Sequence, residues 1–243
     1  MTDRDFTGGT ILLINKPLKW TSFQVVNKLK FAIGRHLKHS VVIASPANKS
    51  GKLKIGHAGT LDPLATGLLI ICTGKMTKQI EQIQQLEKEY TGRFFIGATT
   101  PCFDLEKEPD TFFDTGHITA DMIRKTAEQF KGTILQLPPA HSAVKIDGKR
   151  AYELARQGKE FEIKPKSVTI YEFEITAIEM PYVDFRVVCS KGTYIRSLAN
   201  DFGRALGSGA YLAQLCRTRT GSYKLAEALS PDEVIHLLEN QQA

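Results

Sequence analysis

The chain has 243 residues, a formal net charge of +6 at pH 7 and a hydrophobic content of 42%. This length suits one large domain or two small ones, and the apolar content is sufficient for a core. No apolar run reaches about eighteen residues, which excludes a transmembrane helix, and the polar N-terminus lacks an apolar signal region, which argues against secretion. We therefore expect a cytoplasmic protein.

The four cysteines are scattered along the chain, and none of them forms a CxxC pair. This spacing predicts neither a zinc site nor a disulfide framework. Both conclusions fit a reducing compartment. The chain also lacks the HExxH, GxSxG and GxGxxG motifs, so we expect neither a metal nor an organic cofactor.

The first part of the chain predicts a strand over residues 10–14 and a helix that Thr21 or Ser22 caps. Residues 34–55 are polar, basic and weakly periodic, so we expect a long loop there. No acidic residue lies between Gln24 and Asp62. The cations of this stretch are Lys28, Lys30, Arg35, Lys38, Lys49, Lys52 and Lys54. Such a stripe suits phosphate contacts, although a solvated basic surface has the same composition.

Residues 56–67 read GHAGTLDPLATG and contain a single carboxylate, that of Asp62. The apolar run 68–71 behind this segment predicts a buried strand. Because glycine has no Cβ, another backbone can approach the segment closely. The loop can therefore present one acid to a bulky substrate. An Asp before a Pro is also a common turn former, and this plainer interpretation stays open at this point.

The rest of the chain mixes strands with helices. Strands are predicted over residues 90–97, 168–178, 183–189 and 211–220, and helices over the stripe 76–86 and after Thr119, Thr193 and Ser230. Asp147-Gly148 predicts a tight turn between two short extended pieces, with a basic helix over 150–157. These elements favour an α+β fold: a mixed, largely antiparallel central sheet flanked by helices, in a single domain over 1–243.

Three segments together resemble one known family. The run GHAGTLDPLATGLLIICTGKMTK resembles the catalytic segment of the TruB family, the bacterial tRNA pseudouridine-55 synthases. KGTYIR, which begins at residue 191, and residues 138–158 match two further segments of that family. The resemblance implies an active-site cleft, an RNA-gripping insertion over 137–158, and a short member without the C-terminal RNA-binding domain. It also implies that the protein isomerises uridine-55 in the T-loop of tRNA.

The resemblance assigns catalysis to Asp62 and matches Tyr90 and Arg196 to the family's active-site tyrosine and arginine. Asp62 would be the nucleophile, and whether it attacks uracil C6 or ribose C1′ stays open. Tyr90 could stack on the base and assist proton removal, and Arg196 could grip the carboxylate with two hydrogen bonds. The apolar positions of its helix include Ile195, Leu198 and Phe202. Arg196 lies off this stripe, so it need not point into the core, and an exposed first-turn arginine is the plainer alternative.

Further matched residues are expected to contact the substrate. His57 would lie beside the flipped base, and Tyr194 would help to form the wall of the pocket. Lys16 matches a lysine near the family's site, although an exposed turn lysine is an equal alternative. The cations of the insertion that would meet the RNA backbone are Lys145, Lys149 and Arg150. The expected partner is the T-arm of tRNA, with no protein partner, no membrane and a monomeric state.

Two alternatives and one departure accompany this prediction. The same cleft could serve an RNA-binding or RNA-folding module without turnover, or the same chemistry could act on a different RNA. Asp62 favours an enzyme, because a carboxylate that faces a phosphate polymer weakens binding. After the Tyr90 strand the family tends to show Thr and Asp residues closed by a glycine. Here residues 97–104 read GATTPCFD, and Asp104 is not followed by a glycine, so the geometry of that loop stays open.

Overall fold

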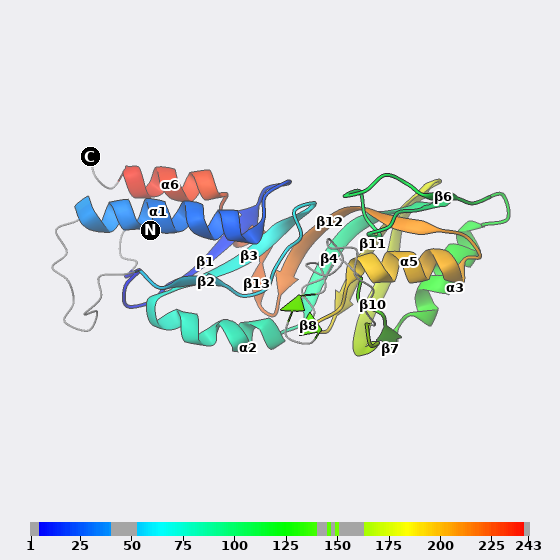
Figure 1. Ribbon diagram of the computed structural model, residues 1–243, viewed down its shortest axis with the longest axis horizontal. Helices are drawn as coiled ribbons and strands as arrows, with labels where there is room; N and C mark the ends of the chain where they lie inside the picture. Colours follow the sequence, from blue (N-terminus) through cyan, green and yellow to red (C-terminus); the bar gives the residue numbers. More distant parts are fainter. Residues whose placement is uncertain (1–4, 40–52, 140–144, 147–148, 151–162, 241–243) are drawn as a thin grey trace. The chain divides into compact units, whose positions relative to one another are not determined.

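A computed structural model describes residues 5–39, 53–139, 145–146, 149–150 and 163–240 of the chain (Figure 1). The chain forms two compact units. The first unit comprises Met1–Leu86 with Cys216–Ala243, and the second comprises Glu87–Leu215. In the part of the chain that the structure describes, no helix has both the length and the apolar character that crossing a membrane requires. The single catalytic domain over 1–243 stays a prediction.

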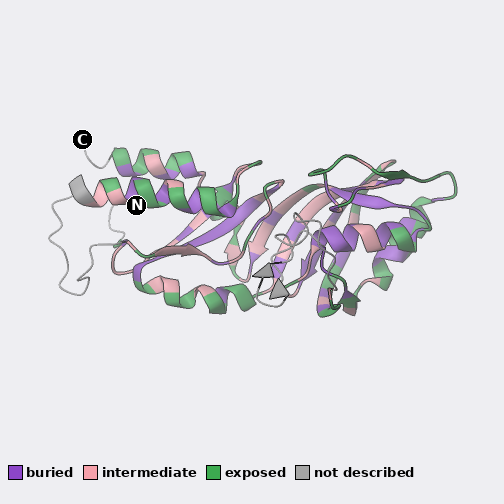
Figure 2. Cartoon of the chain, in the orientation of Figure 1, coloured by how far each residue is buried: buried purple, intermediate pink, exposed green. Residues whose placement is uncertain are grey.

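The strands of the first unit are organised around β3 (Ala65–Thr73). β1 (Ile11–Lys16) and β2 (Ile55–His57) both pair with β3 in the antiparallel sense. β12 (Ala210–Thr220) neighbours β3, and its end pairs with β13 (Tyr223–Lys224). β3 is buried on both faces because its sequence is a continuous apolar run, and it is purple along most of its length in Figure 2. The predicted strands over 10–14 and 68–71 are confirmed.

The helices of the first unit are α1 (Ser22–His39), α2 (Ile80–Gln85) and α6 (Pro231–Glu239), with short 3-10 turns at η1 (Gly74–Gln79) and η2 (Leu225–Glu227). α1 packs beside α6 (Figure 1). Thr21 begins α1 with a reciprocal capping pair, because its hydroxyl accepts from the Gln24 amide and Gln24 Oε1 accepts from the Thr21 amide. Ser230 makes the predicted capping box at the start of α6.

The expected loop over 34–55 is wrong at both ends. Residues 34–39 continue α1, and this end of the helix packs through His36, whose Nδ1 lies 3.2 Å from the Leu238 carbonyl oxygen and whose ring meets Phe6 edge-on. A glycine inside a helix costs only about 1 kcal/mol, which this packing outweighs. Ile55 belongs to β2. Residues 40–52 lie outside the described part of the chain.

In its described residues, the second unit is a row of antiparallel strands with the helices α3 (Ala120–Gln129) and α5 (Ile195–Ala205). β4 (Lys88–Ile96), β11 (Tyr182–Cys189), β10 (Lys166–Glu179) and β7 (Gly132–Gln136) pair in that order, and the start of β12 neighbours β4. The predicted hairpin of β10 and β11 is confirmed, whereas β7 was not predicted. Thr119 caps α3. Helices and mostly antiparallel strands make an α+β fold, as predicted.

Aromatic packing forms the core of the second unit and fixes α5. Phe94 of β4 stacks on Phe185 of β11 with ring centroids 4.2 Å apart. Phe202 of α5 contacts Phe94 and also Phe173 of β10, at 5.5 and 5.6 Å between centroids. Because Phe202 is one of the apolar positions expected for this helix, the predicted stripe is confirmed as core. This packing sets the position of the first turn of α5.

Two short strand pairs complete the second unit. β5 (Ala98–Thr99) pairs with β6 (Thr111–Phe112), and β8 (Lys145–Ile146) pairs with β9 (Lys149–Arg150). β8 and β9 confirm the two extended pieces around the expected turn at 147–148, which itself lies outside the described residues. Arg150 belongs to a strand, so a helix does not begin there. The remainder of the predicted basic helix, residues 151–157, lies outside the described part of the chain.

Candidate active site

Asp62 lies in the first unit, in the loop between the end of β2 and the start of β3. The residue is half-buried, and its backbone carbonyl accepts a hydrogen bond of 3.1 Å from the Ala65 amide, which closes a turn around Pro63. Gly67 follows with φ +98°, and a Cβ on it would lie 2.4 Å from the Arg217 carbonyl oxygen. The predicted close approach of another backbone therefore occurs here, and that backbone is β12.

Ser22 holds the residue that precedes Asp62. The Ser22 side chain is 3% exposed. Its Oγ accepts a hydrogen bond of 2.9 Å from the Leu61 amide and donates one of 3.1 Å to the Leu61 carbonyl. Both backbone groups of Leu61 are thus satisfied by one buried hydroxyl from the first turn of α1. Ser22 was expected only as a helix cap, and this contact was not predicted.

Lys16 holds the residue that follows Asp62. It is fully buried, with 0% exposure, so the alternative of an exposed turn lysine is wrong. Its ammonium donates to the carbonyls of Pro17, Trp20 and Pro63 at 2.9, 2.6 and 3.4 Å. Burial lowers the pKa of Lys16 to about 8, and the negative charge of Asp62 opposes this lowering. Lys16 therefore places positive charge beside the Asp62 loop.

Arg217 supports the start of the same loop from β12. This arginine is 2% exposed. Its Nε donates to the Leu68 carbonyl at 2.7 Å and its Nη2 donates to the Gly59 carbonyl at 3.1 Å. The strand over 211–220 was predicted, but neither Arg217 nor Arg219 was given a role. No local pattern could have predicted these contacts, because they join Arg217 to residues that lie far away in the sequence.

His57, at the end of β2, lies beside this support. Burial lowers the pKa of His57, a hydrogen bond to the Gly59 backbone opposes this, and the charge of Arg217 lowers the pKa further. The imidazole is therefore neutral near pH 7. Among the described residues, no hydrogen-bond partner meets its buried Nδ1 atom. The residue is partly exposed, and a neutral ring can contact an uncharged base through its accessible part.

The second unit holds Tyr90 and Arg196. Tyr90 lies on β4 opposite Val187 of β11 and is 9% exposed. Arg196 lies in the first turn of α5 and is 5% exposed, so the alternative of an exposed first-turn arginine is wrong. A cation at a helix N-terminus opposes the helix dipole. Nearby oxygens offset this cost, because Arg196 Nη1 donates to the Cys102 carbonyl at 3.4 Å and Nε lies 3.6 Å from Asp104 Oδ2.

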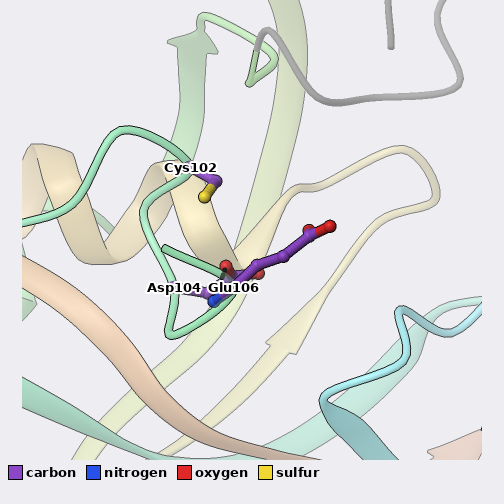
Figure 3. Close-up of side chains that lie close together, drawn as sticks. All are labelled: Cys102, Asp104 and Glu106. Atoms are coloured by element: carbon purple, nitrogen blue, oxygen red, sulfur yellow. Dashed lines mark hydrogen bonds between the residues drawn. The ribbon is translucent and has the colours of Figure 1, made fainter. Parts of the chain in front are cut away.

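Asp104 belongs to a tight loop between β5 and β6, which Figure 3 shows with its neighbours. The Asp104 carbonyl accepts from the Thr100 hydroxyl at 2.7 Å, and Oδ1 accepts from the Glu106 amide at 3.0 Å. Phe103 takes the left-handed backbone conformation, with φ +63°. The chain therefore makes this turn without the glycine that the family tends to show. Asp104 was not predicted as a partner of Arg196.

The side chains of Cys102, Asp104 and Glu106 gather close enough to raise the question of a metal, with ligand atoms within 4.8 Å of one another (Figure 3). Their chemistry does not favour one. The Arg196 guanidinium already lies beside Asp104 and repels a cation. Burial, followed by the charge of Asp104, raises the pKa of the Cys102 thiol to about 11, so it stays protonated. We assign this cluster to the support of Arg196.

Gln136 fixes the residue before α5. This buried amide donates from Nε2 to the Tyr194 carbonyl at 3.0 Å and accepts through Oε1 from the Tyr194 amide at 2.7 Å. Ser197 of α5 donates to the Leu137 carbonyl at 2.7 Å. The end of β7 thus anchors the start of α5 at two points. Neither Gln136 nor Ser197 was predicted, because β7 itself was not.

The predicted site residues therefore divide between the two units. The first unit contains Lys16, His57 and Asp62 around one loop, and the second contains Tyr90, Tyr194 and Arg196. Lys145, Lys149 and Arg150 lie on β8 and β9, where Lys145 is paired with Arg150. Their side chains, and most of the predicted insertion around them, lie outside the described part of the structure.

Comparison with known proteins identifies the family. Residues 47–195 match the TruB family pseudouridylate synthase (N terminal domain). The tRNA pseudouridine synthase B of Flavobacterium johnsoniae is 56% identical over 232 residues, which cover 94% of this chain and 96% of that protein. The protein of the same name from Parabacteroides distasonis is 51% identical and covers 97% of this chain and 95% of its own length.

Solved structures agree on the fold. The chain matches one titled as an H/ACA RNP bound to a substrate RNA containing 2′-deoxyuridine, with TM-score 0.65 and 25% identity. It also matches one of a Cbf5-Nop10-Gar1 complex, with TM-score 0.67 and 28% identity. Each covers 95% of this chain, and the chain spans 53% and 54% of those proteins. The fold is that of a pseudouridine synthase catalytic domain, and the chain belongs to the TruB family of pseudouridylate synthases.

Proposed function

We propose that this chain converts uridine-55 in the T-loop of tRNA to pseudouridine, with Asp62 as the nucleophile. Membership of the TruB family makes the protein a pseudouridine synthase, an isomerase. The single observation that carries the finer proposal is the Asp62 loop. Buried side chains hold the backbone of this loop on both sides of the one carboxylate, as a preorganised nucleophile requires.

The reaction sets the requirements for the site. The bond between uracil N1 and ribose C1′ breaks, and a new bond forms between uracil C5 and C1′. C5 loses its proton and N1 gains one, so atoms and electrons balance without a further reagent. The target base must leave its stack before any side chain can reach it. A nucleophile, a flat group to hold the base and a cation to keep the nucleophile ionised meet these needs.

Asp62 takes the first role. Attack at uracil C6 and attack at ribose C1′ both need an ionised carboxylate at a fixed position, and the proposal covers either. The Lys16 ammonium and the negative charge of Asp62 attract one another. Lys16 also holds the Pro63 carbonyl, so its charge and its hydrogen bond serve the same loop.

Tyr90 and Arg196 take the other two roles in this proposal. Tyr90 is mostly shielded from water, which suits a ring that stacks on a loose uracil and a hydroxyl that assists removal of the proton from C5. Arg196 provides the positive charge that keeps the reacting carboxylate ionised. Its burial and its support by Asp104 mean that this charge is already oriented before the substrate arrives.

The remaining residues are proposed to hold the RNA. His57, with a neutral ring that is partly exposed, contacts the displaced base, and Tyr194 helps to form the wall of its pocket. Lys145, Lys149 and Arg150 contact the RNA backbone from the insertion. A net charge of +6 predicts that binding weakens steeply as salt rises. We propose that a monomer binds the T-arm without a protein partner.

Tritium release tests this proposal, because the new bond at C5 displaces the hydrogen there. Full-length tRNA labelled with tritium at C5 of its uridines is incubated with the purified chain. We expect about one equivalent of tritium per tRNA, and none from a matched tRNA that carries cytidine at position 55. Tritium release from both RNAs would show that another uridine reacts. Binding of both RNAs without tritium release from either would indicate an RNA-binding module.

A further inference from the structure

We propose that the exposed face of α1 is a second RNA contact, which binds the substrate tRNA away from the uridine that reacts. This α1 face consists of Phe23, Asn27, Lys30, Phe31 and Arg35, all of them exposed. At about 100° per residue these positions fall within an arc of about 140° on one side of the helix. The identity of the RNA rests on the proposed function.

The composition of this face favours RNA over an apolar partner. Phe23 and Phe31 are each 67% exposed, which is unusual for two phenylalanines on one short surface. The Arg35 guanidinium lies over the Phe31 ring, 4.7 Å from its centroid. Flat rings interleaved with cations are the arrangement that binds nucleic acid, because bases stack on the rings while the cations contact phosphates.

Charge complementarity supports the same occupant. Ser22–His39 contains no Asp or Glu. On the neighbouring α6, Asp232 forms an ion pair with Lys28 at the edge of the face. Lys30 and Arg35 therefore face solvent with no carboxylate on their own helix. A polyanion gains from both cations, whereas a second copy of this basic chain would be repelled.

The position of the face relates it to the candidate site within the first unit. α1 begins at Ser22, whose hydroxyl binds the backbone of Leu61, the residue before Asp62. With a rise of about 1.5 Å per residue, Phe31 lies roughly 14 Å and Arg35 roughly 20 Å along the helix from that point. A flipped nucleotide at Asp62 cannot reach so far. The α1 face should therefore contribute to tRNA affinity and not to the chemical step.

The test measures the Kd for full-length tRNA and the single-turnover rate at saturating tRNA. We expect Phe31→Ala to raise the Kd about tenfold. We expect the double variant Lys30→Gln and Arg35→Gln to reduce the slope of log Kd against log salt by about two. The single-turnover rate of these variants at saturating tRNA should equal that of the wild type. Because all three side chains are exposed, the thermal unfolding midpoint reports whether the variants fold.

Phe112→Ala is the matched control. Phe112 is 76% exposed on β6 and lies between the exposed acids Asp110 and Asp114, so it should not contact RNA. The proposal is overturned if Phe31→Ala leaves the Kd unchanged, if the double variant keeps the wild-type salt slope, or if Phe112→Ala weakens binding as much. The Kd is read without turnover, so failure of the proposed reaction on the same tRNA would be seen separately.

Discussion

Ser22→Ala tests whether the loop that carries Asp62 is held in place by its anchors. The Ser22 hydroxyl is buried and makes two hydrogen bonds with the Leu61 backbone, at 2.9 and 3.1 Å. Alanine removes both and leaves a buried N–H and a buried C=O facing a methyl group. Neither group can recover its lost hydrogen bond unless the loop moves or water enters.

The magnitude follows from these two groups. An unsatisfied buried polar group costs about 1–3 kcal/mol, so Ser22→Ala, which leaves two of them, should lower the free energy of unfolding by about 2–6 kcal/mol. If Leu61 shifts to find water, Asp62 shifts with it. A displacement of about 1 Å at a reacting group costs up to roughly 100-fold in rate. We therefore expect the single-turnover rate to fall at least about tenfold.

Urea unfolding and tritium release in single turnover measure the two effects. Ser230→Ala is the control in the same unit, because Ser230 caps α6 with an Oγ that accepts from the Glu233 amide at 3.2 Å. Loss of this cap should cost about 1 kcal/mol and leave the rate unchanged. If Ser22→Ala lost no more stability than Ser230→Ala and reacted at the wild-type rate, the loop would not depend on Ser22.

Three further predictions concern the buried charges. Burial lowers the pKa of Lys16 from 10.5 to about 8, so between these pH values the unfolded chain binds more protons than the folded chain. The unfolding free energy of the wild type should therefore rise with pH in this range relative to that of Lys16→Met. Parallel pH curves of the two proteins would contradict this prediction. In Arg217→Lys the shorter side chain cannot reach both the Gly59 and Leu68 carbonyls, so the free energy of unfolding in urea should fall by about 1.5–3 kcal/mol. An unfolding midpoint equal to that of the wild type would show that Arg217 does not support the loop. Asp104→Ala removes a carboxylate from beside Arg196, so it should lower the free energy of unfolding by about 3 kcal/mol and slow tritium release. The control Asp110→Ala, at an exposed position, should do neither. Equal effects of the two substitutions would contradict the role of Asp104.

Local patterns in the sequence predicted most of the secondary structure. The β10 and β11 hairpin, the apolar stripe of α5 and the capping box of α6 each depend on residues close together in the chain, and each is confirmed. β7 was missed because its burial pattern is mostly exposed, so it has no clear apolar alternation. The end of α1 was missed because Gly34 and the polar residues near it suggested a loop.

The candidate site divides in the same way. The loop around Asp62 was predicted because its glycines and proline are local signals. Its anchors were not, because Ser22 and Arg217 come from α1 and β12, far from the loop in sequence. The burial of Arg196 was also missed, since helical periodicity does not report the oxygens of Cys102 and Asp104 that surround it. Contacts between distant segments leave no pattern in a single sequence.

Asp62→Asn is the most direct test of the claim that one carboxylate performs the chemistry. The amide has nearly the same shape, so the loop and its anchors should be retained, but it cannot act as the nucleophile. In single turnover with saturating tRNA labelled at C5 of its uridines, we predict no tritium release together with a Kd close to that of the wild type. Sustained release of tritium by the Asp62→Asn protein would contradict the account.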